Sequence, residues 1–558
     1  MTSTTTTIDS PSAAQEQEEQ EEQEEEQEQE QEQHLKQTKK VLIIGAGPAG
    51  LLAAILFLRR NNNNSNNNTR YQVTLVDPGV DHGKLDAEGL KKKRSWMIAL
   101  SAHGLAAIRT VPQLFEDYVK QLGVDIQHAT YGLTSTWFVD ANMERFIQEG
   151  ASVFTVDRNY ICAGLARYLN DHFLKDATTS IKMNGVDESE TNEFVSHYET
   201  AALFVDGENH SVICRPNRTS KMNENNNNDF TLDYDLLLGC DGIRSVVRNA
   251  FLTTHRDFCF DIKDLFGVGK AMHLALPHDG SLKDGTFMFL NNPIPNAGSF
   301  ILPETDQMTN VNIGFKLDTK IAPELESKDA AVVSAYLKRH FKAFSLDCDE
   351  VGKQWVAQGW STTGQVHCSF YHSHALSALL MGDAAHATSP QIGQGMNTAL
   401  ADAVALDELL NEHKNNFDAV LSAFSVARVK EGHALTDLSF YTFSISGSQQ
   451  FRLMLRQQLH TSLHRILPWL VRSAWPMDDI TLGGKLSVAY EKMVRNGVLG
   501  SVRRVNDDIM REHFETTNGM VRTNTTTTTT LGCSWFTILA AAVASVAAFY
   551  TYGVQHRK

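Results

Sequence analysis

Three short segments carry residues whose types and spacing suit the binding of a nucleotide. The first is GAGPAG at residues 45–50, which follows four apolar residues and precedes a predicted helix at 51–59. In a strand–turn–helix unit, Gly45 permits a tight turn, Gly47 lets the backbone approach a pyrophosphate, and Gly50 lets the helix pack close to the strand. The helix N-terminus then offers free N–H groups and a positive dipole end to the phosphates. This segment predicts a dinucleotide site.

An acidic residue follows a second predicted strand at residues 71–77. Asp77 lies 27 residues beyond Gly50, and removing the asparagine-rich run 61–68 shortens this distance to 19. That is the usual distance to the acid that hydrogen-bonds the adenosine ribose. The alternative is an ordinary turn aspartate that precedes Pro78.

The second segment, residues 234–248, again predicts a strand, a small-residue turn and a helix. Asp241 and Gly242 at the turn place a carboxylate and a bare backbone where a nucleotide can bind. Ser245 can cap the helix, and Arg248 can reach a phosphate or a neighbouring carboxylate. A plain strand–turn–helix without a ligand is the alternative.

The third segment, residues 379–402, is the most specific stretch of the chain. A strand ends at Gly382-Asp383, a loop rich in Pro and Gly follows, and a helix starts near Gly395. Asp383 can accept hydrogen bonds from a polyol, and the helix N-terminus can stabilise negative charge on a flat ring. His386 has a structural and a catalytic interpretation, and its alanine-rich surroundings favour the structural one.

The elements around these segments predict an α/β fold with an inserted sheet. Short strand candidates at 271–276, 286–290, 299–302 and 310–317 are separated by Gly, Pro, Asn and Asp, as in a mixed or antiparallel sheet. Such a sheet, facing a cofactor, forms a wall for a substrate.

Composition separates the folded part from a tail. The 558 residues carry a net charge of −16, but eleven of these charges belong to glutamates in residues 15–33, which leaves −5 elsewhere. The Glu/Gln run has no apolar stripe and predicts disorder. No basic cluster indicates nucleic-acid binding. The N-terminus has no secretory signal, and seven scattered cysteines indicate a reducing compartment without structural zinc.

The C-terminal region predicts helices at 449–472 and 485–512, and then a membrane anchor. Residues 533–554 are 22 uncharged residues, enough to cross about 30 Å of hydrocarbon. Trp535, Tyr550 and Tyr552 lie near the ends of this segment, like an aromatic belt. A soluble packing helix is the alternative.

Taken together, GAGPAG, CDGxxSxxR and GDAAHxxxPxxGQGMN resemble the FAD-dependent aromatic hydroxylases, the single-component flavoprotein monooxygenases. Within this family the chain is most similar to the kynurenine 3-monooxygenase branch, through residues 94–101, 393–397 and 437–441. The similarity covers residues 39–508.

This resemblance implies a Rossmann-like FAD-binding domain with an inserted mixed β-sheet substrate domain, C-terminal helices and one C-terminal transmembrane helix. The expected parts are a disordered tail (1–38), the FAD-binding domain in two pieces (39–258, with substrate-side strands near 127–156, and 361–445), the substrate sheet (259–360), a helical region (446–515), a Thr-rich linker (516–532) and a transmembrane helix (533–554).

The resemblance also implies the site residues. The adenosine diphosphate half of FAD is expected at Gly45, Ala46, Gly47, Pro48, Ala49, Gly50 and Asp77. The phosphates, ribityl chain and flavin ring are expected at Arg94, Arg158, Asp241, Gly382, Asp383, Pro390, Gly393, Gly395, Met396 and Asn397. Asn397 and Tyr441 are substrate-side candidates.

In chemical terms, the resemblance implies a resident FAD, NADPH or NADH as a transient reductant, and dioxygen. A flavin hydroperoxide then transfers one oxygen atom to an aromatic substrate, so neither a protein nucleophile nor a metal is needed. The resemblance also implies a catalytic domain that faces the cytosol, with the mitochondrial outer membrane as a candidate location.

Two departures from the kynurenine branch leave the substrate open. An arginine that clamps the substrate carboxylate has no match, since residues 127–132 read QHATYG and Arg145 comes too late. A His-x-Trp-Pro-Arg element is replaced by FLNNP at 289–293. The alternatives are a monooxygenase acting on a lipophilic quinone, prenyl or polyene substrate, an oxygen-independent flavin reductase, and a non-catalytic flavoprotein scaffold.

Overall fold

The structure is a computed structural model that describes most of the chain between residues 37 and 517. The described residues are 37–63, 69–93, 95–132, 138–141, 153–174, 193–217, 229–315, 320–467, 469–470, 480 and 483–517. The chain divides into two units, Met1–Asp507 and Asp508–Lys558, and everything that follows concerns the first.

A six-stranded sheet forms the centre of the region that is predicted to bind FAD. Its strand order is β18 (His372–Ser373), β19 (Ala378–Leu380), β12 (Leu236–Gly239), β1 (Gln37–Ile44), β2 (Thr69–Val76) and β8 (Phe194–His197). All neighbouring strands pair in parallel except β18 and β19. Parallel strands are covered on both faces, which explains why Val41, Ile43 and Leu237 are fully buried. The prediction of an α/β fold is confirmed.

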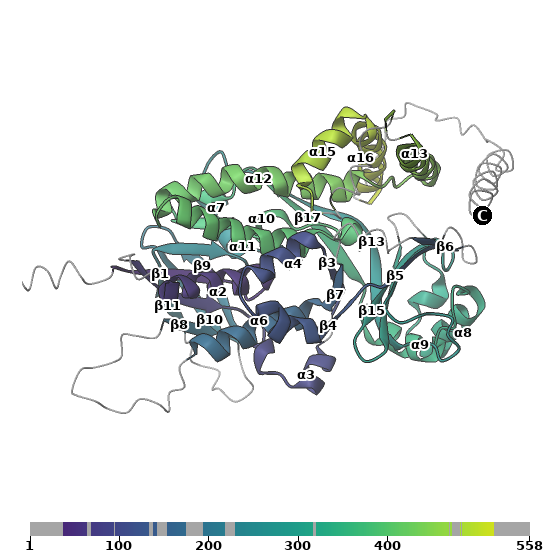
Figure 1. The fold of residues 1–558 in the computed structure, drawn as a ribbon, viewed down its shortest axis with the longest axis horizontal. Helices are drawn as coiled ribbons and strands as arrows, with labels where there is room; N and C mark the ends of the chain where they lie inside the picture. The colour runs from purple at the N-terminus through teal and green to yellow at the C-terminus, as the bar shows by residue number, and fades with distance from the viewer. Residues whose placement is uncertain are drawn as a thin grey trace, which may run out of the picture. The chain divides into compact units, whose positions relative to one another are not determined.

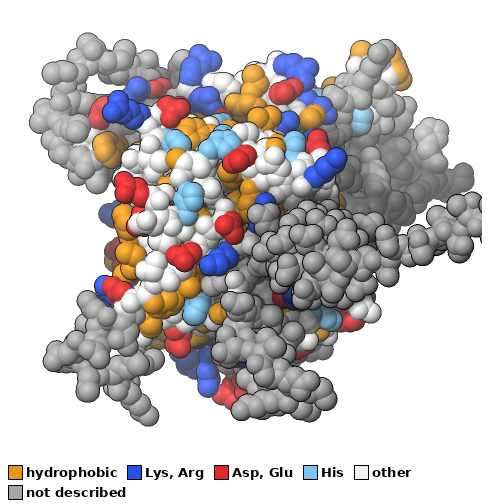
Figure 2. All heavy atoms as spheres, turned by 90° about the vertical axis from the view of Figure 1, so that its left-hand side faces the viewer, with side chains coloured by type: hydrophobic (Ala, Val, Ile, Leu, Met, Phe, Trp, Pro, Cys, Tyr) orange, Lys and Arg blue, Asp and Glu red, His pale blue; other side chains and the backbone are white. Residues whose placement is uncertain are grey.

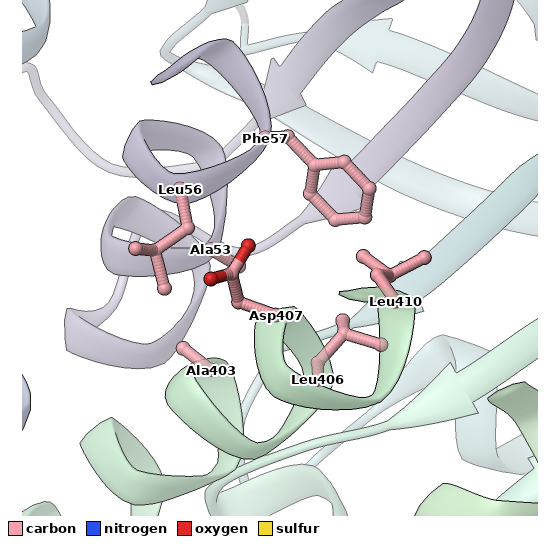
Figure 3. Close-up of a pocket in the computed structure, with 7 residues that line it drawn as sticks. All are labelled: Ala53, Leu56, Phe57, Ala403, Leu406, Asp407 and Leu410. Atoms are coloured by element: carbon pink, nitrogen blue, oxygen red, sulfur yellow. The ribbon is translucent and has the colours of Figure 1, made fainter. Parts of the chain in front are cut away.

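Helices from distant parts of the sequence cover this sheet (Figure 1). They are α2 (Pro48–Asn63), α6 (Arg158–Phe173), α7 (Val246–Thr254), α10 (Asp383–His386), α11 (Gly395–Glu412) and α12 (Phe417–Tyr441). The helix α2 packs against both α6 and α11. Figure 3 shows the seam between α2 and α11, where Phe57 and Leu410 face a small apolar pocket with Asp407 beside it. The seam is packing between helices and lies away from the motifs.

A seven-stranded sheet is formed by the region predicted to hold a mixed sheet. Its order is β17 (Ser361–Cys368), β13 (Phe260–Ala275), β16 (Met308–Phe315), β15 (Ala297–Glu304), β14 (Thr286–Asn291), β5 (His128–Gly132) and β6 (Phe138–Ala141). Only β14 and β5 pair in parallel, so the sheet is mixed, as predicted. Helices α8 (Ala330–His340) and α9 (Cys348–Ala357) add a second core around the fully buried Trp355 (Figure 1).

Two three-stranded sheets complete the α/β part. One contains β3 (Met97–Leu100), β7 (Phe154–Asp157) and β4 (Gly123–Asp125), and the other contains β11 (Phe230–Asp233), β10 (Ser211–Pro216) and β9 (Thr200–Asp206). In the sequence, the helix α3 (Ala87–Lys92) precedes β3 and the helix α4 (Ala102–Arg109) follows it.

The C-terminal helices differ from the prediction in one respect. A helix at 449–472 corresponds to α13 (Gly447–Ile466), but the helix expected at 485–512 is broken into α15 (Leu486–Arg495) and α16 (Val498–Thr517). The break lies at Gly497, whose φ is +73°. A left-handed residue cannot continue an α-helix, and glycine adopts this conformation without the steric cost that other residues meet.

Several predicted features lie outside the described residues: the tail up to residue 36, residues 64–68 of the asparagine-rich run, Arg94, Arg145, most of the linker and the predicted transmembrane helix at 533–554. Two boundaries differ from the prediction, because residues 37 and 38 begin the strand β1 and residues 61–63 form the last turn of α2. Within the residues that the structure describes, no helix is long and apolar enough to cross a membrane.

One face of the molecule shows how the surface charge is distributed. Figure 2 shows acidic and basic side chains interspersed there, with histidines among them. On this face the described residues present no patch of a single sign.

Candidate functional site

The three motifs meet at the carboxyl ends of adjacent parallel strands. The glycine turn follows β1, Asp77 follows β2, the Asp241 turn follows β12, and Gly382 follows β19. In open α/β sheets this edge is where ligands bind. Segments that are more than 300 residues apart in sequence, Gly45 and Asp383, thus belong to one edge.

Each glycine of the first motif has the surroundings that its position requires. Gly45 has φ +107°, and a Cβ there would lie 2.2 Å from the carbonyl oxygen of Cys240. A Cβ on Gly50 would lie 2.0 Å from the carbonyl oxygen of Gly45, so the helix packs on its own turn. A Cβ on Gly47 would meet nothing within 4 Å. The Gly47 side of the turn is therefore open to a ligand.

The carboxylate of Asp77 lies beside this turn. Its Oδ2 accepts a hydrogen bond from the Ala46 N–H at 2.7 Å, and its Oδ1 accepts one from the Gly79 N–H at 2.6 Å. The acid predicted to contact a ribose is thereby fixed next to the residues predicted to contact the pyrophosphate.

One carboxylate oxygen of Asp241 accepts hydrogen bonds, and the other has no hydrogen-bond partner. Its Oδ2 accepts hydrogen bonds from the backbone N–H groups of Val246 at 2.7 Å and Val247 at 3.3 Å, at the start of α7. Its Oδ1 is buried without a hydrogen-bond partner. Burial raises the pKa of Asp241, although the hydrogen bonds from Ser245 and the helix start oppose this rise. An unpaired buried acceptor is costly unless a donor reaches it.

The arginine of the second motif has a different role from the two that were predicted. Ser245 caps α7 as expected, since its Oγ accepts from the Arg248 N–H at 2.9 Å. The Arg248 side chain, however, is only 1% exposed and donates to the carbonyl oxygens of Ala384 at 2.8 Å and Ile243. It reaches neither a phosphate site nor a carboxylate, and instead ties α7 to α10.

The third motif follows β19 and curves back to α11. Gly382 has φ +57°, Asp383 is exposed at the first position of α10, and Gly393 has φ +62° before α11 begins at Gly395. The predicted start of this helix is confirmed. Asp383 is thus exposed at the carboxyl edge of the sheet.

A buried ion pair holds this motif in place. Asp402 is only 1% exposed. Its Oδ1 accepts a hydrogen bond from Arg428 at 2.6 Å. Its Oδ2 accepts one from the Gly382 N–H at 2.9 Å and contacts His386 Nε2 at 2.7 Å. This contact gives the buried His386 its structural interpretation. Sequence reasoning missed the role of Asp402, although the third motif ends on this residue.

Both substrate-side candidates are occupied by contacts within the protein. Asn397 is 1% exposed, donates to the carbonyl oxygens of Ala99 at 3.1 Å and Gly393 at 2.9 Å, and accepts from the Ser101 N–H at 2.9 Å. Tyr441 donates to Asp507 at 2.9 Å and is 5% exposed. Burial and this hydrogen bond raise the pKa of Tyr441. Both residues position helices in this structure.

The segments of the two predicted arginines lie side by side. Asp157, the last residue of β7, accepts from the Ser95 N–H at 2.6 Å, and the Arg158 N–H donates to the Trp96 carbonyl at 3.1 Å. The Arg158 side chain is exposed. Arg94 itself is not among the described residues, but its neighbour Ser95 is held next to Arg158.

A row of three glycines crosses the seven-stranded sheet next to Trp96. Gly269, Gly314 and Gly298 are in register across β13, β16 and β15. Trp96 lies against this row, since its ring would be 3.5 Å from a Cβ on Gly269. A cross-strand pair of aromatics, Phe289 and Phe300, lies on the same face of the sheet. Trp96 therefore lies against a flat and partly aromatic face of the sheet.

Comparison with known protein families defines the class. Residues 188–439 match the model of a family described as FAD binding domain, a range that contains the second and third motifs. The glycine turn lies outside this range but is joined to it through the pairing of β1 with β12. This match covers less than half of the chain and shows that this part is similar to an FAD binding domain.

The relatives agree with the resemblance drawn from the motifs. The chain is 30% identical to kynurenine 3-monooxygenase of Sus scrofa over 248 residues, which cover 42% of this chain and 49% of that protein. It is 30% identical to violacein synthase of Chromobacterium violaceum over 244 residues, which cover 43% of this chain and 56% of that protein. The chain thus spans about half the length of these curated relatives.

A solved structure shares the fold. The crystal structure of a mutant of 2-methyl-3-hydroxypyridine-5-carboxylic acid oxygenase aligns with a TM-score of 0.51 at 16% identity, covering 72% of this chain and 90% of that chain. The family match and the relatives confirm the resemblance drawn from the motifs, and the solved structure shows a shared fold.

We predict that alanine at two glycines of the first motif has different effects on stability. Gly50→Ala forces a Cβ against the Gly45 carbonyl and should lower the free energy of unfolding by ~1–3 kcal/mol or more. Gly47→Ala adds a methyl group into open space and should leave stability unchanged. Thermal unfolding of both variants measures the difference, and equal melting temperatures would contradict the turn geometry.

We also predict that Asp402→Asn strongly destabilises the protein. The substitution leaves the Arg428 guanidinium without its buried counter-charge, which costs ~3–5 kcal/mol. Asp437→Asn is the matched control, because its partner Arg503 is 44% exposed and such pairs contribute ~1 kcal/mol or less. Denaturant unfolding at neutral pH measures both.

Acid provides a second test of the same pair. Burial raises the pKa of Asp402, but His386 and Arg428 outweigh burial and hold the pKa at about 2. Since this folded-state pKa lies below the unfolded value, the stabilisation is fully present above about pH 4 and is lost as the pH falls towards 2. The stability difference between wild type and Asp402→Asn should therefore shrink over this range.

Proposed function

We propose that the protein is an FAD- and NAD(P)H-dependent monooxygenase that hydroxylates an aromatic small molecule. The observation that carries this proposal is the convergence of Gly47, Asp77, Asp241 and Asp383 at one edge of a parallel sheet. The family match and the kynurenine 3-monooxygenase relative support it.

The residues at this edge fit FAD. The open side of Gly47 accommodates a pyrophosphate, and the carboxylate of Asp77 suits the adenosine ribose. The unpaired Oδ1 of Asp241 and the exposed Asp383 suit donors of the ribityl chain. When bound, the flavin supplies the redox and oxygen chemistry.

The protein's own residues then have positioning roles. Asn397 fixes the N-terminus of α11 against β3 and α4, so that the positive end of the helix dipole points towards the loop from Pro390 to Gly393. A preorganised dipole at this point stabilises negative charge on a ring held there. Trp96 packs against the glycine row of the seven-stranded sheet, and this surface would exclude water from a ring held against it.

A lipophilic ring is the second candidate substrate, and one observation favours it. The described strands of the seven-stranded sheet contain no arginine. Of the two lysines on β13, Lys270 donates to the carbonyl oxygens of Trp355 and Gln358, and Lys263 is paired with Asp261. The sheet face that carries Phe289 and Phe300 thus suits an aromatic ring better than a carboxylate.

A C-terminal membrane anchor at residues 533–554 is part of the proposal, on the strength of their uncharged sequence. The full chain should then resist alkaline carbonate extraction from membranes, whereas a chain that ends at residue 532 should be released. Release of both would remove the anchor from the proposal.

We predict substrate-stimulated oxidation of NADPH or NADH with stoichiometric oxygen uptake and one atom of ¹⁸O₂ in the product. The screen should include kynurenine, other aromatic acids and quinones. Turnover without oxygen would select a flavin reductase instead. The absence of turnover with any member, in a protein that retains FAD, would favour the scaffold alternative.

Two variants connect this activity to the site. Asp383→Ala and Gly47→Ala should both lose bound FAD, measured by flavin absorbance per protein, and should stay folded. Asp418→Ala, at a carboxylate that is 86% exposed on α12, is the control and should retain FAD. Full FAD occupancy in Asp383→Ala would contradict the assignment of the site.

A further inference from the structure

The helix α13 (Gly447–Ile466) carries an apolar face that the described protein does not cover. Phe451 is 38% exposed, Leu455 48%, Leu459 59% and Ile466 56%. At 100° per residue these four positions fall within one third of the helix circumference. The turn after the helix continues this surface with Trp469, which is 71% exposed.

The charge of this segment is opposite to that of the chain. Residues 438–477 contain four arginines and no acidic residue, although the whole protein carries a net charge of −16. Arg452 and Arg456 are exposed and lie next to the apolar face on the helix. A basic rim along an apolar stripe suits lipid headgroups.

Two hydrogen bonds fix α13 to the protein. Gln449 donates to the carbonyl oxygen of Ser501 at 3.1 Å, and Arg456 donates to that of Asn496 at 3.0 Å. These contacts hold the helix against α16 and the turn before it, so the apolar face keeps its direction. A fixed amphipathic helix binds a surface without having to fold on it.

We propose that α13 and the turn at Trp469 dock on the surface of a bilayer that contains anionic lipids. The apolar residues enter the interface, and the arginines bind the headgroups. Because the rest of the chain is acidic, the interaction is confined to this face and orients the protein on the membrane. The proposal depends neither on the enzymatic activity nor on the C-terminal anchor.

Hydrogen–deuterium exchange of the full chain tests this proposal. The full-length protein is measured alone, with phosphatidylcholine vesicles, and with vesicles that also contain phosphatidylserine. We expect peptides from residues 447–470 to be protected on the anionic vesicles and much less on the neutral ones. Equal protection on both vesicles would overturn the role of charge, and protection on neither would overturn the proposal.

Variants separate the contributions. Arg452→Glu should weaken the vesicle-dependent protection by more than about fivefold, since removing one positive charge alone accounts for about that factor. Leu459→Asp should abolish it, and its melting temperature should stay unchanged because the side chain is exposed. Arg339→Glu, an exposed arginine on α8, is the control for net charge and should bind like wild type.

Hydrogen–deuterium exchange without vesicles shows whether protein, instead of lipid, covers the apolar face of α13. Protection of α13 that rises with protein concentration would indicate a second copy of the chain. Protection at every concentration without vesicles would indicate a segment of the same chain. Either result would overturn the proposal.

Discussion

The parallel pairing of four strands is the constraint on which the site depends. The turns after β1, β12 and β19 each donate an N–H to the last carbonyl of a neighbouring strand: Gly45 to Val76, Cys240 to Ile44 and Met381 to Gly239, at 2.7–3.0 Å. This ladder fixes the relative heights of turns that lie far apart in sequence. Insertions between the strands, such as the seven-stranded sheet, leave these hydrogen bonds intact. In the proposed site, the three motifs lie together only because this edge is held in register.

The loop beyond β19 needs a second restraint, because it leaves the sheet after Met381. Asp402 supplies it by joining Gly382, His386 and Arg428 in a cluster that is buried except for Arg428, whose side chain is 12% exposed. A buried carboxylate is costly unless every oxygen is paired, so the cluster has only one favourable arrangement. Arg248 and Asn397 add further links, to α10 and to β3. The exposed Asp383 is thereby presented on a rigid frame.

The sequence predicted what depends on local patterns: the glycine turn, the Ser245 cap, the helix start at Gly395 and the mixed sheet. It could not predict which polar side chains turn inward. Arg248 and Asn397 have the residue types of ligand-binding groups, and only the packing around them shows that they bind the backbone. The break at Gly497 was missed because the apolar pattern continues across it, whereas the left-handed backbone does not. The row of three glycines was equally hidden, since it depends on the register of three strands.

The central claim is that one FAD lies along the carboxyl edge of the six-stranded sheet. An experimental structure of the purified, flavin-loaded protein tests it most directly. The account predicts the adenosine diphosphate beside Gly47 and Asp77, the ribityl chain between Asp241 and Asp383, and the flavin ring between the loop at Pro390–Ile392 and the substrate sheet. A flavin bound elsewhere, or a nucleotide at this edge whose ring points away from the substrate sheet, would contradict it.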